Sequence, residues 1–135
     1  MASPADSPVH NITTKAQFDE LVKTTPYVAL QAHASWCGPC KAISPIFNKQ
    51  AKEHTSEKFA FAKFDTDDVP DLAFELGIRS IPAFFFFENG DKDSDLMGAV
   101  PPKLTAAIGG YANKAKGGAE EKPAEENTLK TDENF

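Results

Sequence analysis

The sequence predicts one α/β domain with a central mixed β-sheet flanked by helices on both faces. Strand-like and helical segments alternate along most of the chain, which is typical of parallel strands joined by crossover helices. Near the end, two strand-like segments are separated by Asn89-Gly90, a pair that favours the tight turn of an antiparallel hairpin. The length of 135 residues suits a single domain of ordinary size.

The first half of the chain predicts two helices around one strand, and the pattern leaves open whether another strand comes first. Thr14 begins a capping-box sequence, and the apolar spacing that follows predicts a short helix ending before Pro26. Residues 27–34 are mostly apolar and strand-like. The helix after Cys37 has one apolar face, formed by Ile43, Ile46, Phe47 and Ala51. Pro45 lies inside this helix, so we expect a kink rather than an end.

The second half predicts a strand, a brief helix, a two-stranded hairpin and a final helix. The expected ranges are, in order, 59–64, 71–76, 83–87, 94–98 and 102–116. The first and third ranges are nearly all apolar, as in strands covered on both faces. Gly77 is expected to close the brief helix. The final helix carries an apolar stripe of Leu104, Ile108, Tyr111 and Ala115.

Composition excludes several classes of protein. No apolar run approaches the roughly 20 residues that a membrane helix needs. The net charge of −6 argues against nucleic acid and anionic membranes as partners. Two cysteines are too few for a disulfide-rich scaffold or a four-cysteine zinc site. Residues 1–8 lack the basic and apolar regions of a secretory signal, so we expect a cytoplasmic protein.

The predicted folded unit covers residues 9–116. Residues 1–8 are expected to form a flexible N-terminus. Residues 117–135 contain six acidic and two basic residues, and only Leu129 and Phe135 are large and apolar. Such a segment buries too little apolar surface to offset its loss of conformational entropy, so we expect an acidic disordered tail. An acidic docking tail is the alternative interpretation.

Cys37 and Cys40 are the candidate reactive groups. Their C-x-x-C spacing lets them bridge across one turn, at the junction of a predicted strand and a predicted helix. The unpaired amides and positive dipole end of a helix N-terminus favour a thiolate on Cys37, the species that attacks a disulfide. Cys40, one turn further, is then placed to resolve a mixed disulfide. Gly38 is expected to permit the turn, and Pro39 fixes φ where its missing amide is not needed.

Two other interpretations of the cysteines were considered. In a zinc site, His33 could supply a third ligand, but no fourth Cys or His is nearby in the sequence. We therefore predict no metal. The second interpretation is an inert, buried pair of cysteines, which their position at a strand-to-helix junction disfavours.

The sequence Trp36-Cys37-Gly38-Pro39-Cys40-Lys41 resembles the active site of the thioredoxin family, of cytosolic type. Further similarities are Phe18-Asp19, Pro45, Lys63 to Asp67, Gly77 to Pro82, Glu88 to Gly90, and Met97 to Ala99. The resemblance implies a thioredoxin fold and reduction of protein disulfides, in which Cys37 attacks and Cys40 resolves. It also implies no bound cofactor, with NADPH used indirectly through a thioredoxin reductase.

The resemblance further implies a substrate groove formed by Trp36, Ile81, Pro82 and Gly98. Pro82 corresponds to the family's cis-proline, whereas an ordinary trans-proline would be expected without the resemblance. A cis peptide would turn the Ile81 backbone toward the cysteines, where it could form strand-like hydrogen bonds with an extended substrate segment.

Two positions depart from the family pattern. Gln31 stands where the family usually has a buried aspartate, and His33 where it usually has an aromatic residue. In the family the aspartate accepts or relays the proton of the resolving thiol, a role that glutamine cannot fill as a base. Lys63 matches the lysine beside that aspartate and is expected to lack its usual partner. We expect the same class of reaction with an altered rate and pH profile.

The expected partners are a thioredoxin reductase and disulfide-containing proteins, with the chain acting as a monomer in electron transport and cell redox homeostasis. A secretory oxidase or isomerase is an alternative, although such proteins usually have a different dipeptide between the cysteines. A redox-dependent binding module or chaperone subunit, which would use the groove without turnover, is the alternative from another class.

Overall fold

A computed structural model of the chain describes residues 8–117. In chain order, its elements are β1 (Val9–Ile12), α1 (Lys15–Thr24), β2 (Tyr27–His33), α2 (Gly38–His54), β3 (Phe59–Asp65), α3 (Pro70–Glu75), β4 (Ala83–Glu88), β5 (Asp91–Met97) and α4 (Pro101–Ala115). The flexible N-terminus and the acidic tail expected from the sequence lie outside the described residues, apart from Pro8 and Gly117. No helix within residues 8–117 combines the length and apolar character needed to cross a membrane.

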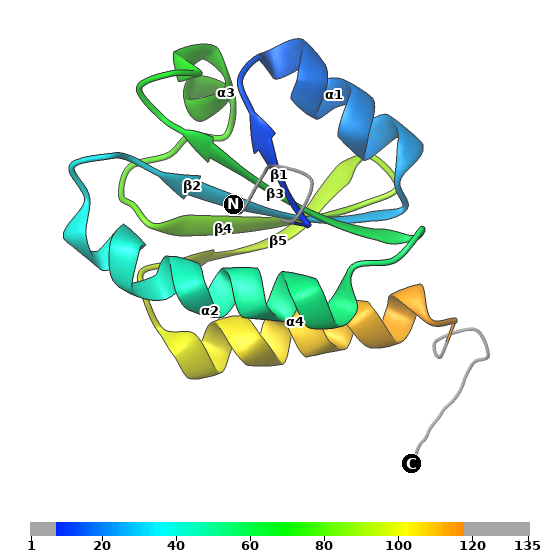
Figure 1. Ribbon diagram of the computed structural model, residues 1–135. Helices are drawn as coiled ribbons and strands as arrows, with labels where there is room; N and C mark the ends of the chain where they lie inside the picture. The colour runs from blue at the N-terminus through cyan, green and yellow to red at the C-terminus, as the bar shows by residue number, and fades with distance from the viewer. Residues whose placement is uncertain (1–7, 118–135) are drawn as a thin grey trace, which may run out of the picture.

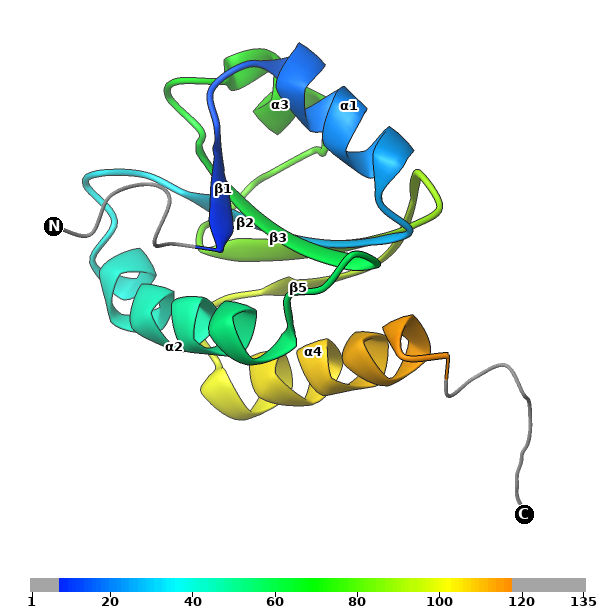
Figure 2. The same cartoon turned by 45° about the vertical axis from the view of Figure 1, so that its right-hand side comes forward.

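The strands form one mixed sheet in the order β1-β3-β2-β4-β5. Strands β1 and β2 both pair with β3 in parallel, while β4 is antiparallel to β2 and to β5. Helices α1 and α3 cover one face of the sheet, and α2 and α4 cover the other (Figures 1 and 2). The predicted fold class, a central mixed sheet flanked by helices on both faces, is confirmed.

The apolar runs of the central strands supply both cores at once. Successive side chains of a strand point to opposite faces, so alternate residues of one run enter different cores. Phe84 and Phe86 of β4 join the core under α2 and α4, whereas Phe85 and Phe87 join the core under α1 and α3. Phe47 of α2 is fully buried, with its ring centroid 5.6 Å from that of Phe84. The apolar sequence of β4 therefore fixes it as an interior strand.

Some boundaries differ from the prediction. An initial strand, β1, is present, and β5 begins at Asp91 rather than at residue 94. The side chains at the start of β5 are polar and exposed, so apolar patterning does not mark them. Helices α3 and α4 each begin one residue earlier than predicted, at Pro70 and Pro101, because proline in a first turn needs no amide donor. Helix α2 continues through Pro45, as predicted.

Gly77 closes α3 and directs the chain toward the cysteines. Its φ of 66° lies in the left-handed region, which favours glycine. The amide of Gly77 donates to the carbonyl of Phe74 at 3.0 Å, and the amide of Ile78 donates to that of Ala73 at 3.2 Å. These two bonds form a Schellman motif, as expected for a helix that ends at glycine. The segment that follows carries Ile81 and Pro82.

Candidate active site

Cys37 and Cys40 form a disulfide at the start of α2, with their Cα atoms 5.3 Å apart. Cys37 is the N-cap residue of the helix, and its Sγ accepts a hydrogen bond from the Cys40 amide at 3.1 Å. Pro39 lies in the first turn, where no amide is required. The junction predicted from the sequence is therefore present, with a backbone donor aimed at the sulfur of Cys37.

Gly38 does not adopt the left-handed conformation that glycine permits, so the expected reason for glycine at this turn is wrong. Among the described glycines, positive φ values occur at residues 77, 90, 98 and 117, so the turn does not need a left-handed residue at position 38. A Cβ added to Gly38 would meet no atom within 4 Å. Gly38 is exposed at the start of the helix.

Both cysteines are buried in the disulfide form. Cys37 is only 4 % exposed and Cys40 2 % exposed. Both pack with Ala34 and with the partly buried side chain of Ile81, which together cover the sulfurs. The roles of the two cysteines in this state therefore rest on their positions in the helix rather than on exposure.

The residues of the expected groove come from three segments, and among them Ile81 packs against the disulfide. Trp36 is 69 % exposed, and its Nε1 donates to Oδ2 of Asp67 at 2.9 Å. The Ile81–Pro82 peptide bond is cis, as expected. The Pro82 carbonyl accepts a hydrogen bond from the Gly98 amide at 2.8 Å, which joins the loop before β4 to the end of β5.

Exposed apolar side chains extend the surface near Gly98. Met97 is 48 % exposed and Val100 is 40 % exposed, which is unusual for large apolar residues. Sequence reasoning placed Met97 in this loop but missed Val100. It also missed the hydrogen bond that Trp36 donates to Asp67. These residues are 31 positions apart, and only the pairing of β2 with β3 brings them together.

Gln31 lies beneath the first turns of α2 and is fully buried. Its Nε2 donates to Oγ of Ser44 at 3.1 Å, and that hydroxyl donates to the Cys40 carbonyl at 2.7 Å. Its Oε1 has no hydrogen-bond partner within residues 8–117. The altered position 31 is thus buried and linked to the cysteine-bearing turn. Ser44 was missed, although its spacing of four residues after Cys40 places it on the same helix face.

Lys63 and His33 complete this region. Lys63 is the β-sheet partner of Gln31, and no ion pair of its side chain is found among residues 8–117. His33 is half-buried, and its Nε2 is buried with no hydrogen-bond partner in the part of the chain that the structure describes. Burial lowers the pKa of His33 below its usual value because it disfavours the cation; Asp65 and Asp68 oppose this, whereas Lys63 adds to it.

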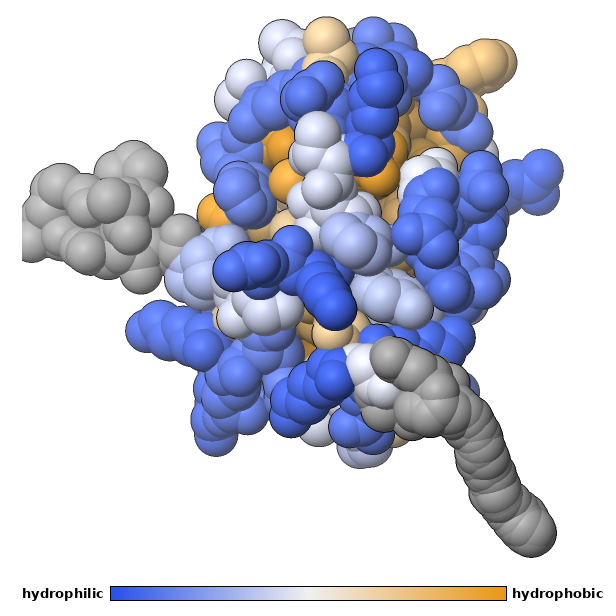
Figure 3. Space-filling view, turned by 90° about the vertical axis from the view of Figure 1, so that its right-hand side faces the viewer, coloured by the Kyte–Doolittle hydropathy of each residue, from blue (hydrophilic) through white to orange (hydrophobic). Residues whose placement is uncertain are grey.

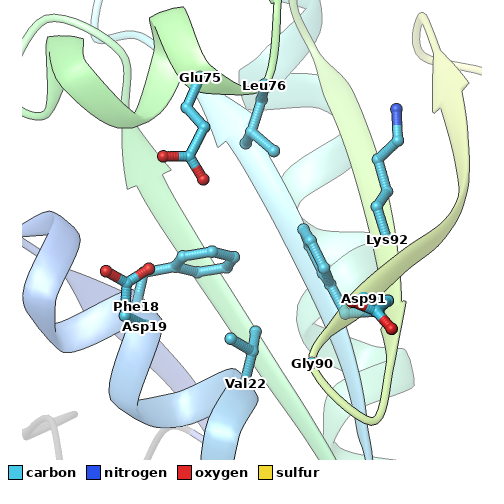
Figure 4. Close-up of a pocket in the computed structure, with 9 residues that line it drawn as sticks. Phe18, Asp19, Val22, Glu75, Leu76, Gly90, Asp91 and Lys92 are labelled. Carbon is cyan, nitrogen blue, oxygen red and sulfur yellow. The ribbon is translucent and has the colours of Figure 1, made fainter.

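A separate pocket of about 290 Å³ lies between α1, α3 and the β4–β5 turn (Figure 4). Phe18 and Phe87 form part of its wall, and Lys15 bridges Asp19 and Glu75 at 3.0 Å each. Neither cysteine nor histidine lines it, so it contributes nothing to thiol chemistry. Within residues 8–117, no group of three or more His, Cys, Asp and Glu side chains is placed to hold a metal ion.

A close cysteine pair at a helix N-terminus, beside a mixed sheet, is the arrangement of a thiol–disulfide oxidoreductase. The sequence model named Thioredoxin matches residues 9–109, and the chain belongs to the thioredoxin family. It is 45 % identical over 104 residues to Thioredoxin Asp f 29 of Aspergillus fumigatus, an alignment that covers 74 % of this chain and 92 % of that protein. Dithiol–disulfide exchange through Cys37 and Cys40 is therefore its chemistry.

Other relatives agree on the family. The chain is 41 % identical over 103 residues to Thioredoxin-like protein 1 of Schizosaccharomyces pombe, and the match covers 74 % of this chain but 36 % of that longer protein. The crystal structure of Malassezia sympodialis thioredoxin superimposes with a TM-score of 0.74 at 39 % identity, covering 78 % of this chain and 92 % of that one.

Proposed function

We propose that this chain reduces disulfide bonds in client proteins and serves as an electron carrier that a thioredoxin reductase recycles at the expense of NADPH. The observation that carries the proposal is the redox pair itself. Cys37 caps α2 beside the exposed Trp36, and its sulfur already accepts the Cys40 amide hydrogen. That donor stabilises negative charge on the Cys37 sulfur when the disulfide is open.

The reaction proceeds in two exchange steps. In the first, the Cys37 thiolate attacks a client disulfide, a Cys37–client bond forms, and one client sulfur leaves as a thiolate. In the second, the Cys40 sulfur attacks Cys37, the Cys37–Cys40 bond forms, and the second client sulfur leaves. Two electrons pass from the chain to the client, and the reductase returns two electrons and two protons to the pair.

We further propose a monomeric, cytoplasmic protein. Its pair of cysteines suits a reducing compartment, since chains built for oxidising compartments commonly carry structural disulfides in addition to a reactive pair. The net charge of −6 favours protein clients over nucleic acid.

Trapping distinguishes the two cysteines. Cys40→Ser should accumulate a covalent mixed disulfide with insulin, because Cys37 still attacks and nothing resolves the product. Cys37→Ser should accumulate little, and the variant with both substitutions should accumulate none. Mass spectrometry after acid quenching and alkylation measures the adducts, and insulin reduction by the unmodified chain with dithiothreitol measures turnover. Preferential trapping by Cys37→Ser would reverse the roles, and absence of turnover would favour the binding module.

A further inference from the structure

Two buried polar atoms on β2 have no hydrogen-bond partner among the described side chains. They are Oε1 of Gln31 and Nε2 of His33. The two residues are separated by one position, so their side chains lie on the same face of the strand. That face is the one covered by α2, because Gln31 donates to Ser44 of that helix. Buried polar groups are normally satisfied, so two unpartnered atoms beneath the redox helix require an explanation.

The strand and the helix run in opposite directions, which places His33 relative to Cys40. Helix α2 runs back over the sheet after the loop that follows β2 (Figures 1 and 2). From Gln31 to His33 the strand advances about 6.6 Å. The same distance along α2 is about four residues, which leads from Ser44 back to Cys40. Ala34, which follows His33 beyond the end of β2, packs with both cysteines, so this end of the strand lies beside the redox turn.

We propose that His33 accepts the proton of the Cys40 thiol when Cys40 resolves the mixed disulfide, and that Gln31 positions the cysteine-bearing turn for this transfer. The proposal rests on the exchange reaction described above. Gln31 has no basic group, and its amide is engaged with Ser44, which holds the Cys40 carbonyl. The imidazole is therefore the base that this face of the strand offers.

The transfer balances within the second exchange step. The Cys40 thiol loses its proton to Nε2 of a neutral His33, and the resulting thiolate attacks Sγ of Cys37. The Cys37–Cys40 bond forms as the Cys37–client bond breaks, and the client sulfur leaves as a thiolate. The imidazolium then returns its proton to the departing thiolate or to solvent, so His33 is regenerated.

The surroundings of His33 suit this role. Asp65 is its partner on β3, Asp68 follows that strand, and Lys63 lies further back on it, while α2, which covers this face, carries Cys40. Burial and Lys63 lower the pKa of His33, so the imidazole is neutral and able to accept a proton near pH 7. The two aspartates stabilise the imidazolium once it forms. A buried base with adjacent counter-charges is the arrangement that proton transfer requires.

His33→Phe tests the proposal, because a ring is kept at the position while the base is removed. Reduced protein is mixed with excess insulin, quenched in acid at successive times, alkylated and analysed by mass spectrometry at several pH values. The mixed disulfide should form at the unmodified rate but resolve at least tenfold more slowly at pH 7. The inflection that His33 gives the resolution rate, below the ordinary histidine pKa of about 6.5, should disappear. His10→Phe, an exposed histidine on β1, should change neither step.

A second variant distinguishes loss of the base from misfolding of His33→Phe. Adding Gln31→Asp to His33→Phe returns a carboxylate base beneath the same turn, so resolution should recover at least part of the lost rate. The proposal would be overturned if His33→Phe left the resolution rate and its pH profile unchanged, or if it slowed formation and resolution of the mixed disulfide equally. It would also be overturned if the double variant resolved the mixed disulfide as slowly as His33→Phe alone. Failure of the unmodified chain to form any mixed disulfide would instead refute the proposed function.

Discussion

Ser44→Ala removes the hydroxyl that joins the buried Gln31 amide to the Cys40 carbonyl. The substitution itself leaves helix α2 unstrained, since alanine is a strong helix former. Its cost arises from Gln31, which is fully buried and would keep its Nε2 donor without a partner. Leaving a buried donor unsatisfied costs about 1–3 kcal/mol, which is the loss we expect in the free energy of unfolding.

A second substitution isolates this interaction. Gln31→Leu removes both the engaged donor and the unpartnered Oε1, so in combination with Ser44→Ala the loss should be smaller than the sum of the two single effects. Replacing both partners of a buried hydrogen bond by apolar groups is often nearly neutral. We therefore expect a coupling energy of about 1 kcal/mol from the double-mutant cycle.

Urea denaturation of the four oxidised proteins measures these free energies. Thr105→Ala is the matched control, because it removes an exposed hydroxyl from another helix and should change stability by less than about 0.5 kcal/mol. A Ser44→Ala effect as small as that of the control, together with additive single effects, would show that the hydroxyl does not hold Gln31 to the helix.

Two other predictions concern the core under α2 and α4. Burial, and next the hydrogen bond to Asp93, raise the pKa of Tyr111 to about 12. The stability that this hydroxyl supplies is thus fully present below pH 10 and is lost as the pH rises to 12. In urea titrations, the unfolding free energies of the unmodified chain and of Tyr111→Phe should therefore converge over that interval. A constant difference between them would contradict the assignment. Phe47→Ala should lower the free energy of unfolding by about 3–5 kcal/mol, because Phe47 is fully buried. Phe74 of α3 is 88 % exposed, so Phe74→Ala should be nearly neutral. Equal losses of the two variants in urea denaturation would refute this contrast.

The sequence predicts the interior strands well because they are covered on both sides. Continuous apolar runs mark β3 and β4, and the order of elements then limits the topology. The first residues of β5 escape this reasoning, since backbone hydrogen bonds to β4 hold an edge strand whose side chains are exposed. Pattern analysis detects burial, and an edge strand can form with little of it.

In the candidate site, too, the features set by local sequence could be predicted, whereas the contacts made by tertiary packing could not. The spacing of Cys37 and Cys40 is local, so their placement at a helix start could be predicted. The partners that surround them are brought together by tertiary packing, as with Asp67 at Trp36 and Ile81 over the disulfide. Position 31 was recognised from the family pattern, but its bond to Ser44 depends on how α2 lies across β2.

The two edge strands of the sheet, β1 and β5, are poorly suited to pairing with an extended client segment. A protein that handles extended client segments risks capturing them along its own free strand edges. Strand β1 offers only four residues, and β5 presents an exposed row of alternating charge that includes Asp91, Lys92 and Asp93. Short length and charge both discourage strand addition. Under the proposed function, backbone pairing with a client is thus disfavoured at the sheet edges, which leaves the loop carrying Ile81, packed against the cysteines, as its expected place.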